Sequence, residues 1–173
     1  TNLQNIELNP EIREIEFDLE QIELGSFDHF MLKEIFEQPQ VLERSMQGRV
    51  DLDSKQIVLG GLTDYMQELV KAKRIILLGQ GTALHAAMIG EYLFEDLAKI
   101  PAEVEYASEF RYRNPIIEEG TVVIAVSQSG ETADTLAAVQ EAKNHGALTF
   151  GAVNVVGSSI PRMTDGGVYL RVG

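Results

Sequence analysis

Apolar runs and segments with helical spacing alternate along the carboxyl-terminal two thirds of the chain. Uninterrupted runs rich in Val and Ile are typical of strands that are buried on both faces of a parallel sheet. The pattern predicts five strands, over residues 74–79, 102–106, 121–126, 147–154 and 167–172. It also predicts helices over residues 82–99 and 131–144. This order indicates an α/β fold, a three-layer α/β/α sandwich around a mostly parallel five-stranded sheet with right-handed crossovers.

The amino-terminal third of the chain has a different pattern. Residues 1–25 mix acidic and apolar side chains without a clean period, and we interpret them as an extended arm or linker. Residues 26–56 carry apolar positions that suit one or two helices on either side of Pro39. We expect the α/β domain to occupy residues 57–173, beginning with an amphipathic segment over 62–71.

The third predicted strand runs directly into a turn rich in hydroxyl groups, Ser127-Gln128-Ser129-Gly130-Glu131-Thr132. A helix start has unpaired N–H groups and the positive end of the helix dipole, so such a turn can bind an anion, and Gly130 can adopt a tight backbone. No phosphate-binding loop with the Gly-Lys-Ser/Thr ending is present, which argues against a nucleoside triphosphate. Neutral donors suit the phosphate monoester of a small metabolite, such as a sugar phosphate. The alternative is that these hydroxyl groups only cap a helix.

A second turn of the same design follows the first predicted strand, at Gly79-Gln80-Gly81-Thr82. Gly79 and Gly81 allow a ligand to approach the backbone closely, and Thr82 offers a hydroxyl donor. A dinucleotide fingerprint would need a third glycine where Leu84 stands, so we discount a nicotinamide cofactor. In an open parallel sheet, ligands bind where the strand order reverses, and the two turns could flank one such crevice.

Composition and charge limit the possible partners. The chain has 27 acidic and 14 basic residues, a formal net charge of −13, which disfavours nucleic acid and anionic lipid. The absence of cysteine excludes disulfides, thiolate metal sites and a cysteine nucleophile. We also find no signal peptide and no apolar run long enough to span a bilayer. We therefore expect a cytoplasmic protein without a membrane or nucleic-acid partner, and propose no cofactor and no metal site.

Several motifs in order along nearly the whole chain closely resemble the glutamine:fructose-6-phosphate aminotransferases, a family also called glucosamine-6-phosphate synthases. They are the run FDHFMLKEIFEQP over 27–39 and the segments 79–82, 107–113, 127–136 and 157–159. The resemblance implies a sugar isomerase (SIS) fold over residues 57–173. It also implies a role in an enzyme that converts fructose 6-phosphate and glutamine to glucosamine 6-phosphate and glutamate, for amino-sugar synthesis.

Carried over by motif, the family's roles predict a hexose phosphate, fructose 6-phosphate or glucose 6-phosphate, as the ligand. The substrate-binding residues would be Thr82, Ser127, Gln128, Ser129 and Thr132, with Gly81 and Gly130. The family usually has Cys-Gly-Thr-Ser at the first turn, where this chain has Gln80 and Ala83 at the outer positions. Ala83 therefore lacks one hydroxyl donor that the resemblance leads us to expect.

The resemblance also implies parts that lie outside this sequence. The family begins with a glutaminase domain and continues, after a glycine like Gly173, into a second SIS subdomain that carries the catalytic glutamate, histidine and lysine. Opening a hexose ring and moving a proton need such a positioned acid and base. We therefore expect a piece truncated before the second subdomain that binds hexose phosphate, has no catalytic residue of its own, and belongs to a homodimer.

Two other functions stay open from the residues alone. One is a stand-alone phosphosugar isomerase or deglycase, which would need a catalytic Glu and His in the same chain. The other is a noncatalytic sugar-phosphate sensor, which in regulators is joined to a basic DNA-binding head and fits this acidic sequence less well.

Other polar residues near the turns have structural interpretations. We interpret Glu131 as structural, because a carboxylate favours the helix dipole but would repel a phosphate. Arg111 and Arg113, beside Glu109, are expected to form ion pairs at a subunit boundary. His85 is expected to pack in the fold or at an interface, and His29 and His145 to bind no metal. Ser158 and Ser159 form a third polar turn, which either lines the crevice or caps the segment before Pro161.

Overall fold

The computed structural model describes residues 24–172. Most of the predicted arm over residues 1–25 therefore lies outside the described residues. The described residues divide into two compact units, with the boundary between Pro39 and Gln40. Helix α2 (Phe30–Met46) starts in the first unit and runs as one element through Pro39, which confirms the single-helix alternative. Within the first unit, Phe27 stacks on Phe36 with ring centroids 5.8 Å apart.

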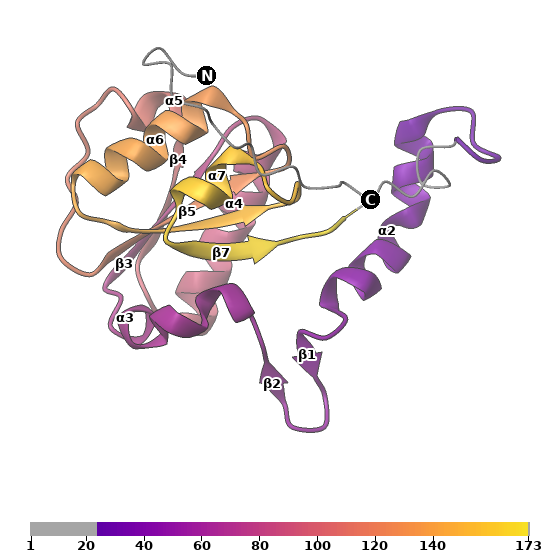
Figure 1. Ribbon diagram of the computed structural model, residues 1–173, viewed down its shortest axis with the longest axis horizontal. Coiled ribbons are helices and arrows are strands. Elements are labelled where there is room, and N and C mark those ends of the chain that lie inside the picture. Colours follow the sequence, from indigo (N-terminus) through magenta and orange to yellow (C-terminus); the bar gives the residue numbers. More distant parts are fainter. Residues whose placement is uncertain (1–23, 173) are drawn as a thin grey trace, which may run out of the picture. The chain divides into compact units, whose positions relative to one another are not determined.

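The second unit is built on the five-stranded parallel sheet that the apolar runs predict (Figure 1). The spatial order is β4-β3-β5-β6-β7, and all four pairings are parallel. The strands are β3 (Arg74–Gly79), β4 (Ala102–Tyr106), β5 (Thr121–Ser127), β6 (Leu148–Val153) and β7 (Gly166–Tyr169). The strands β3 and β5 lie in the centre of the sheet and are mostly buried, because both faces of the sheet are covered.

Helices cover both faces of this sheet, which confirms the three-layer α/β/α architecture (Figure 1). Ile76, Leu78 and Val123 pack on one face beneath α5 (Ala107–Phe110) and α6 (Ala133–Asn144). On the same face, α7 (Ser159–Met163) adds Ile160 to the core beside Val153 and Val139. On the other face, Ile75, Leu77 and Val122 meet Ala87 of α4 (Thr82–Leu93) and the segment formed by η1 (Gly60–Tyr65) and α3 (Met66–Val70). The period of two along each strand thus separates the two core layers.

Four local features differ from the predicted pattern. A short antiparallel hairpin, β1 (Val50–Asp51) with β2 (Gln56–Ile57), was not predicted, because strands of two exposed residues have no usable alternation. The crossover after β4 contains α5, which at four residues is too short to show a helical period. The helix predicted over 82–99 ends at Leu93 and continues as a π-helical turn, η2 (Phe94–Ala98). Helix α6 begins at Ala133, two residues later than predicted, because Thr132 before it has an extended backbone with φ −63° and ψ 116°.

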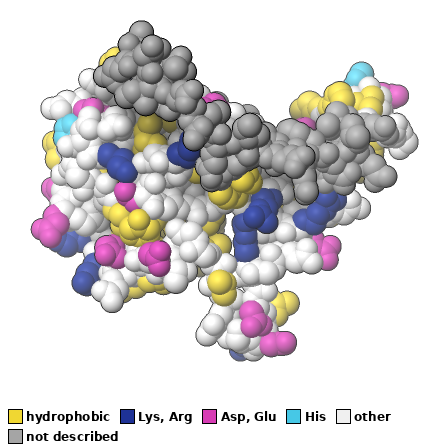
Figure 2. All heavy atoms as spheres, in the orientation of Figure 1, with side chains coloured by type: hydrophobic (Ala, Val, Ile, Leu, Met, Phe, Trp, Pro, Cys, Tyr) yellow, Lys and Arg dark blue, Asp and Glu magenta, His cyan; other side chains and the backbone are white. Residues whose placement is uncertain are grey.

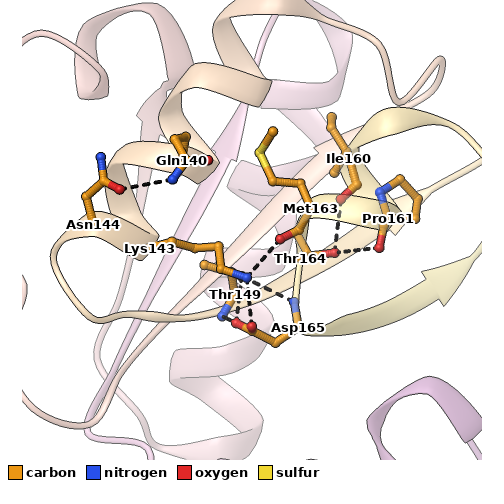
Figure 3. A network of polar contacts seen from close by, with 9 residues as sticks. All are labelled: Gln140, Lys143, Asn144, Thr149, Ile160, Pro161, Met163, Thr164 and Asp165. Atoms are coloured by element: carbon orange, nitrogen blue, oxygen red, sulfur yellow. Dashed lines mark hydrogen bonds and ion pairs between the residues drawn. The ribbon is translucent and has the colours of Figure 1, made fainter. Parts of the chain in front are cut away.

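A polar network joins α6, β6 and the start of β7 (Figure 3). The Asp165 carboxylate accepts hydrogen bonds from Lys143 Nζ at 2.8 Å, from Thr149 N at 2.9 Å and from Thr149 Oγ1 at 2.8 Å. Burial raises the pKa of Asp165, but the hydrogen bonds from Lys143 and Thr149 outweigh it and leave the pKa below its ordinary value. The network connects the amino-terminal ends of β6 and β7, whereas the two polar turns follow the carboxyl ends of β3 and β5.

The surface of the described residues shows neither a membrane helix nor a large patch of one charge on the face in Figure 2. None of the described helices combines the length and hydropathy that crossing a bilayer requires. Acidic and basic side chains are interspersed on that face. Several charged side chains of the described residues form ion pairs, including Arg74 with Glu103 and Lys99 with Asp96.

Candidate functional site

The two polar turns leave the sheet side by side, at the point where the strand order reverses. From β3 the chain crosses to β4 on one side, and then returns past β3 to β5 on the other. Leu78 lies opposite Ala125 in a parallel pairing, so β3 and β5 both end on the same side of the sheet, where their carboxyl ends lie. The structure thus places residues 79–82 and 127–132 on either side of the topological switch point, where open α/β sheets bind ligands.

The β5–α6 turn is organised by its own serines. The Ser127 hydroxyl oxygen accepts a hydrogen bond from Gly130 N at 3.0 Å, and that of Ser129 accepts one from Glu131 N at 3.2 Å. Each hydroxyl still has its own proton to donate. Thr132 occupies the N-cap position of α6 but makes no side-chain capping bond. The capping alternative therefore does not describe Thr132, whose hydroxyl is free to meet a ligand at the start of a 12-residue helix.

The third polar turn, residues 157–159, lies behind the β5–α6 turn. Ser159 N donates to the Glu131 carboxylate at 2.8 Å, and Ile160 N donates to Gly130 O at 3.0 Å. The hydrogen bond from Ser159 lowers the pKa of Glu131, which supports the structural interpretation of this carboxylate. The Ser158 hydroxyl donates to Val155 O rather than facing a crevice. The turn over residues 157–159 therefore supports the β5–α6 turn through hydrogen bonds to Gly130 and Glu131.

Gly130 is essential to that contact. Its φ is +67°, a conformation that L side chains rarely adopt. A Cβ atom on this residue would lie 2.0 Å from Ser158 Oγ and 2.7 Å from Val153 Cγ1. Glycine thus lets the β5–α6 turn pack directly on the turn after β6.

The β3–α4 turn presents its polar groups at the surface. Gly81 is the N-cap residue of α4, with φ +56° and ψ −129°, and nothing lies within 4 Å of the place where a Cβ atom would stand. Thr82 is exposed, and Gln80 is half-buried. This space leaves the backbone at Gly81 accessible, and the approach of a ligand here stays a prediction.

A polar contact that the sequence did not reveal connects the two turns. Asp134, in the first turn of α6, accepts a hydrogen bond from Gln80 Nε2 at 3.4 Å and one from Arg111 Nη1 at 2.8 Å. These partners lie 54 and 23 positions away in the sequence, so no local spacing could have identified them. Arg111 and Arg113 do form ion pairs as expected, but with Asp134 and Glu105 of the same chain.

None of the three histidines, all of which the structure describes, shares a hydrogen bond with this cluster. His85 is exposed on α4, and His29 is exposed before α2. His145 bonds to Glu141 O through Nδ1 and to Asn114 Oδ1 through Nε2. Within residues 24–172, no three or more His, Asp or Glu side chains are grouped so that they could hold a metal ion.

An apolar cavity of about 300 Å³ lies between η1 and α3 and the face of the sheet that carries Ile75 and Val122. Its walls are aliphatic and aromatic side chains with backbone glycine, among them Leu62, Leu69, Phe94 and Phe150. A phosphate would find no donor side chain there. We therefore assign the candidate site to the two turns and not to this cavity.

Two relatives of this chain among known proteins are aminotransferases of the same name. The chain is 53% identical over 172 residues to glutamine–fructose-6-phosphate aminotransferase (isomerizing) of Bacteroides thetaiotaomicron, covering 99% of this chain and 28% of that protein. It is 45% identical over 162 residues to the human glutamine–fructose-6-phosphate aminotransferase (isomerizing) 2, covering 94% of this chain and 24% of that protein. The chain thus spans about a quarter of the length of these relatives.

Solved structures and a family model agree with the fold. The C-terminal domain of glucosamine-fructose-6-phosphate aminotransferase from Francisella tularensis superposes with a TM-score of 0.78 at 35% identity, covering 87% of this chain and 42% of that one. The family model described as the SIS domain matches residues 68–173, which include both polar turns and all five strands of the sheet. The chain therefore belongs to the SIS domain family.

Proposed function

We propose that this chain binds a hexose phosphate, fructose 6-phosphate or glucose 6-phosphate, between its two polar turns. The observation that carries the proposal is the position of these turns, side by side across the topological switch point of a parallel sheet. In this role the chain is the sugar-phosphate-binding part of the isomerase domain of a glutamine:fructose-6-phosphate aminotransferase, the activity named for its relatives.

The phosphate belongs at the β5–α6 turn. The hydroxyl groups of Ser127, which is buried, and of Ser129 and Thr132 all belong to the six residues before α6, and the helix dipole favours negative charge there. Gln128, which is exposed, adds an amide donor. Thr82 and the open backbone at Gly81 then face the sugar from the β3–α4 turn. A net charge of −13 means that the anion is held by these local donors against the field of the whole chain.

The two turns bind but do not supply an acid or base. The carboxylates within residues 127–134 are Glu131 and Asp134, and both already accept hydrogen bonds from within the fold. Ring opening and proton transfer therefore need groups from elsewhere. We propose that a glutaminase domain and a second SIS subdomain of the same polypeptide supply the remaining chemistry, in a cytoplasmic homodimer.

Calorimetric titration of the 173-residue chain tests the binding proposal. Glucose 6-phosphate and fructose 6-phosphate should bind at least about tenfold more tightly than glucose and fructose, because hydrogen bonds to a charged group contribute about 1.5–3 kcal/mol. Ser129→Ala and Thr132→Ala should each weaken hexose phosphate binding by about tenfold. The control is Ser45→Ala, which removes a helix hydroxyl group that donates to Leu42 O and should leave the affinity for hexose phosphate unchanged. If phosphate adds no affinity, or both alanine variants bind like the parent chain, the site is wrongly assigned.

Activity assays separate this proposal from a complete enzyme. We expect the 173-residue chain to form no glucosamine 6-phosphate from fructose 6-phosphate and ammonia, and not to interconvert fructose 6-phosphate and glucose 6-phosphate. Product formation in the first assay would show that the catalytic groups lie within this chain. Turnover in the second would identify a stand-alone phosphosugar isomerase.

A further inference from the structure

We propose that Asp134 is a positioning residue that holds the two ligand-binding turns at the spacing a hexose phosphate needs. The inference rests on the proposed function and adds to it a device that no motif identified. Asp134 does not touch the ligand in this proposal. It acts through Gln80 on the β3–α4 turn and through Arg111 after β4.

The contact spans three neighbouring junctions at one edge of the sheet. Arg111 follows α5, which starts where β4 ends; Gln80 follows β3; and Asp134 lies in the first turn of the helix that follows β5. Because the three strands are consecutive in the sheet, in the order β4-β3-β5, the carboxylate that follows β5 reaches one partner after β3 and one after β4. A single side chain thus ties the sugar-facing turn to the phosphate-facing turn.

The chemistry of the groups fixes how they meet. A carboxylate only accepts hydrogen bonds, so the Gln80 amide must turn its NH₂ group toward Asp134. The separate oxygens of Asp134 take the two partners, Oδ1 from Arg111 and Oδ2 from Gln80. The orientation of Gln80, and with it the path of the backbone between Gly79 and Gly81, therefore depends on Asp134.

Arg111 has a second part in this arrangement. We call the link of Asp134 with Gln80 and Arg111 the clamp. A carboxylate one turn from a bound phosphate would repel the phosphate, yet the clamp depends on the Asp134 carboxylate as its acceptor. The Arg111 guanidinium, 2.8 Å from Asp134 and 4.7 Å from the centre of the Tyr112 ring, compensates this charge. The Asp134–Arg111 pair thus provides a strong acceptor and adds no net charge of its own beside the anion.

The test compares two ligands that the clamp should distinguish. Inorganic phosphate, measured by its competition with glucose 6-phosphate, contacts only the β5–α6 turn, whereas the hexose phosphate needs both turns. Asp134→Ala should weaken glucose 6-phosphate binding by about tenfold, the factor that corresponds to 1.4 kcal/mol, and leave phosphate binding equal or slightly stronger. Gln80→Ala should reproduce this selective loss without a change of charge. The double variant should lose no more than either single variant, because both remove the same link.

Arginine variants test the charge argument. Arg111→Met should weaken both ligands, since Asp134 is then uncompensated, and Asp134→Asn in that background should restore phosphate binding. Arg111→Lys should restore phosphate binding more than glucose 6-phosphate binding, because lysine keeps the charge but not the guanidinium geometry. The matched control is Arg113→Met, which breaks the neighbouring pair with Glu105 and should alter neither affinity.

The outcomes distinguish this proposal from the proposed function. If the parent chain binds glucose and glucose 6-phosphate equally, or if phosphate does not compete, the site itself is wrong and the clamp falls with it. If the parent chain prefers the phosphorylated sugar but Asp134→Ala and Gln80→Ala weaken both ligands equally or neither, the clamp alone is refuted. Thermal unfolding of each variant identifies a loss of fold, and Gln80→Ala, at a half-buried turn position, keeps the test open if Asp134→Ala unfolds.

Discussion

Replacing Gly130 by alanine should both destabilise the fold and abolish hexose phosphate binding. The residue has φ +67°, which costs a non-glycine residue about 1–3 kcal/mol. The new Cβ atom would also lie 2.0 Å from Ser158 Oγ and 2.7 Å from Val153 Cγ1, and such overpacking costs about another 1–3 kcal/mol. Urea denaturation of Gly130→Ala should therefore show a loss of about 2–6 kcal/mol in the free energy of unfolding.

Two comparisons isolate the collision from the backbone strain. Gly146 has φ +82° after α6, and nothing lies within 4 Å of the place where its Cβ atom would stand, so Gly146→Ala should show the strain alone. Adding Ser158→Gly to Gly130→Ala removes the nearest obstructing atoms and should recover part of the stability. Equal unfolding free energies for Gly130→Ala and Gly146→Ala would mean that the two turns do not pack as described.

Binding should fail in Gly130→Ala for a related reason. To relieve the collision the β5–α6 turn must move away from the turn at 157–159, and it would take the hydroxyl groups of Ser129 and Thr132 with it. The affinity for hexose phosphate is a more sensitive measure of this movement than the free energy of unfolding. A displacement of the donors by a fraction of an ångström is enough to break hydrogen bonds to a phosphate. Unchanged hexose phosphate affinity in a folded Gly130→Ala variant would contradict the site assignment.

The sequence predicted the strands well because their signal is local. β3 and β4 begin and end at the predicted residues, and β5 extends one residue beyond its prediction. A buried central strand has apolar side chains on both faces, so the run itself marks its limits. β7 is shorter than predicted, and ends at Tyr169, because pairing with β6 stops there. Its apolar residues continue past the point where the neighbouring strand can pair with them.

The candidate site could be predicted only in part, for the same reason. The hydroxyl-rich turns are contiguous in sequence, and the switch point follows from the alternation of strands and helices. The link between Gln80, Asp134 and Arg111 depends on the order β4-β3-β5, which brings three distant segments together. Likewise, the support that Ser158 and Ser159 give the β5–α6 turn depends on β6 lying beside β5. Spatial order, not residue type, determines these contacts.

Removing the carboxylate of Asp165 should destabilise the sheet domain by about 2–4 kcal/mol. Thr149 is fully buried, and both its N–H group and its hydroxyl donate to Asp165. Asp165→Ala would leave these donors without that acceptor and Lys143 without its carboxylate, so the cost comes mainly from buried groups that lose a hydrogen bond. The exposed pair of Lys99 with Asp96 is the control, and Asp96→Ala should cost no more than about 0.5 kcal/mol.

The effect of Asp165 should also depend on pH in a defined direction. Its pKa is lower in the folded chain than in the unfolded chain, so the stability it contributes is fully present above the unfolded value of about 3.9 and is lost as the pH falls through the folded value. The difference in unfolding free energy between the parent chain and Asp165→Ala should therefore be constant at neutral pH and shrink below about pH 4. Asp165→Asn keeps one acceptor oxygen but no titratable group, so its own stability should lack this acid-dependent contribution. A difference between parent and Asp165→Ala that grows on acidification would show that the carboxylate is not held in its charged form by Lys143 and Thr149.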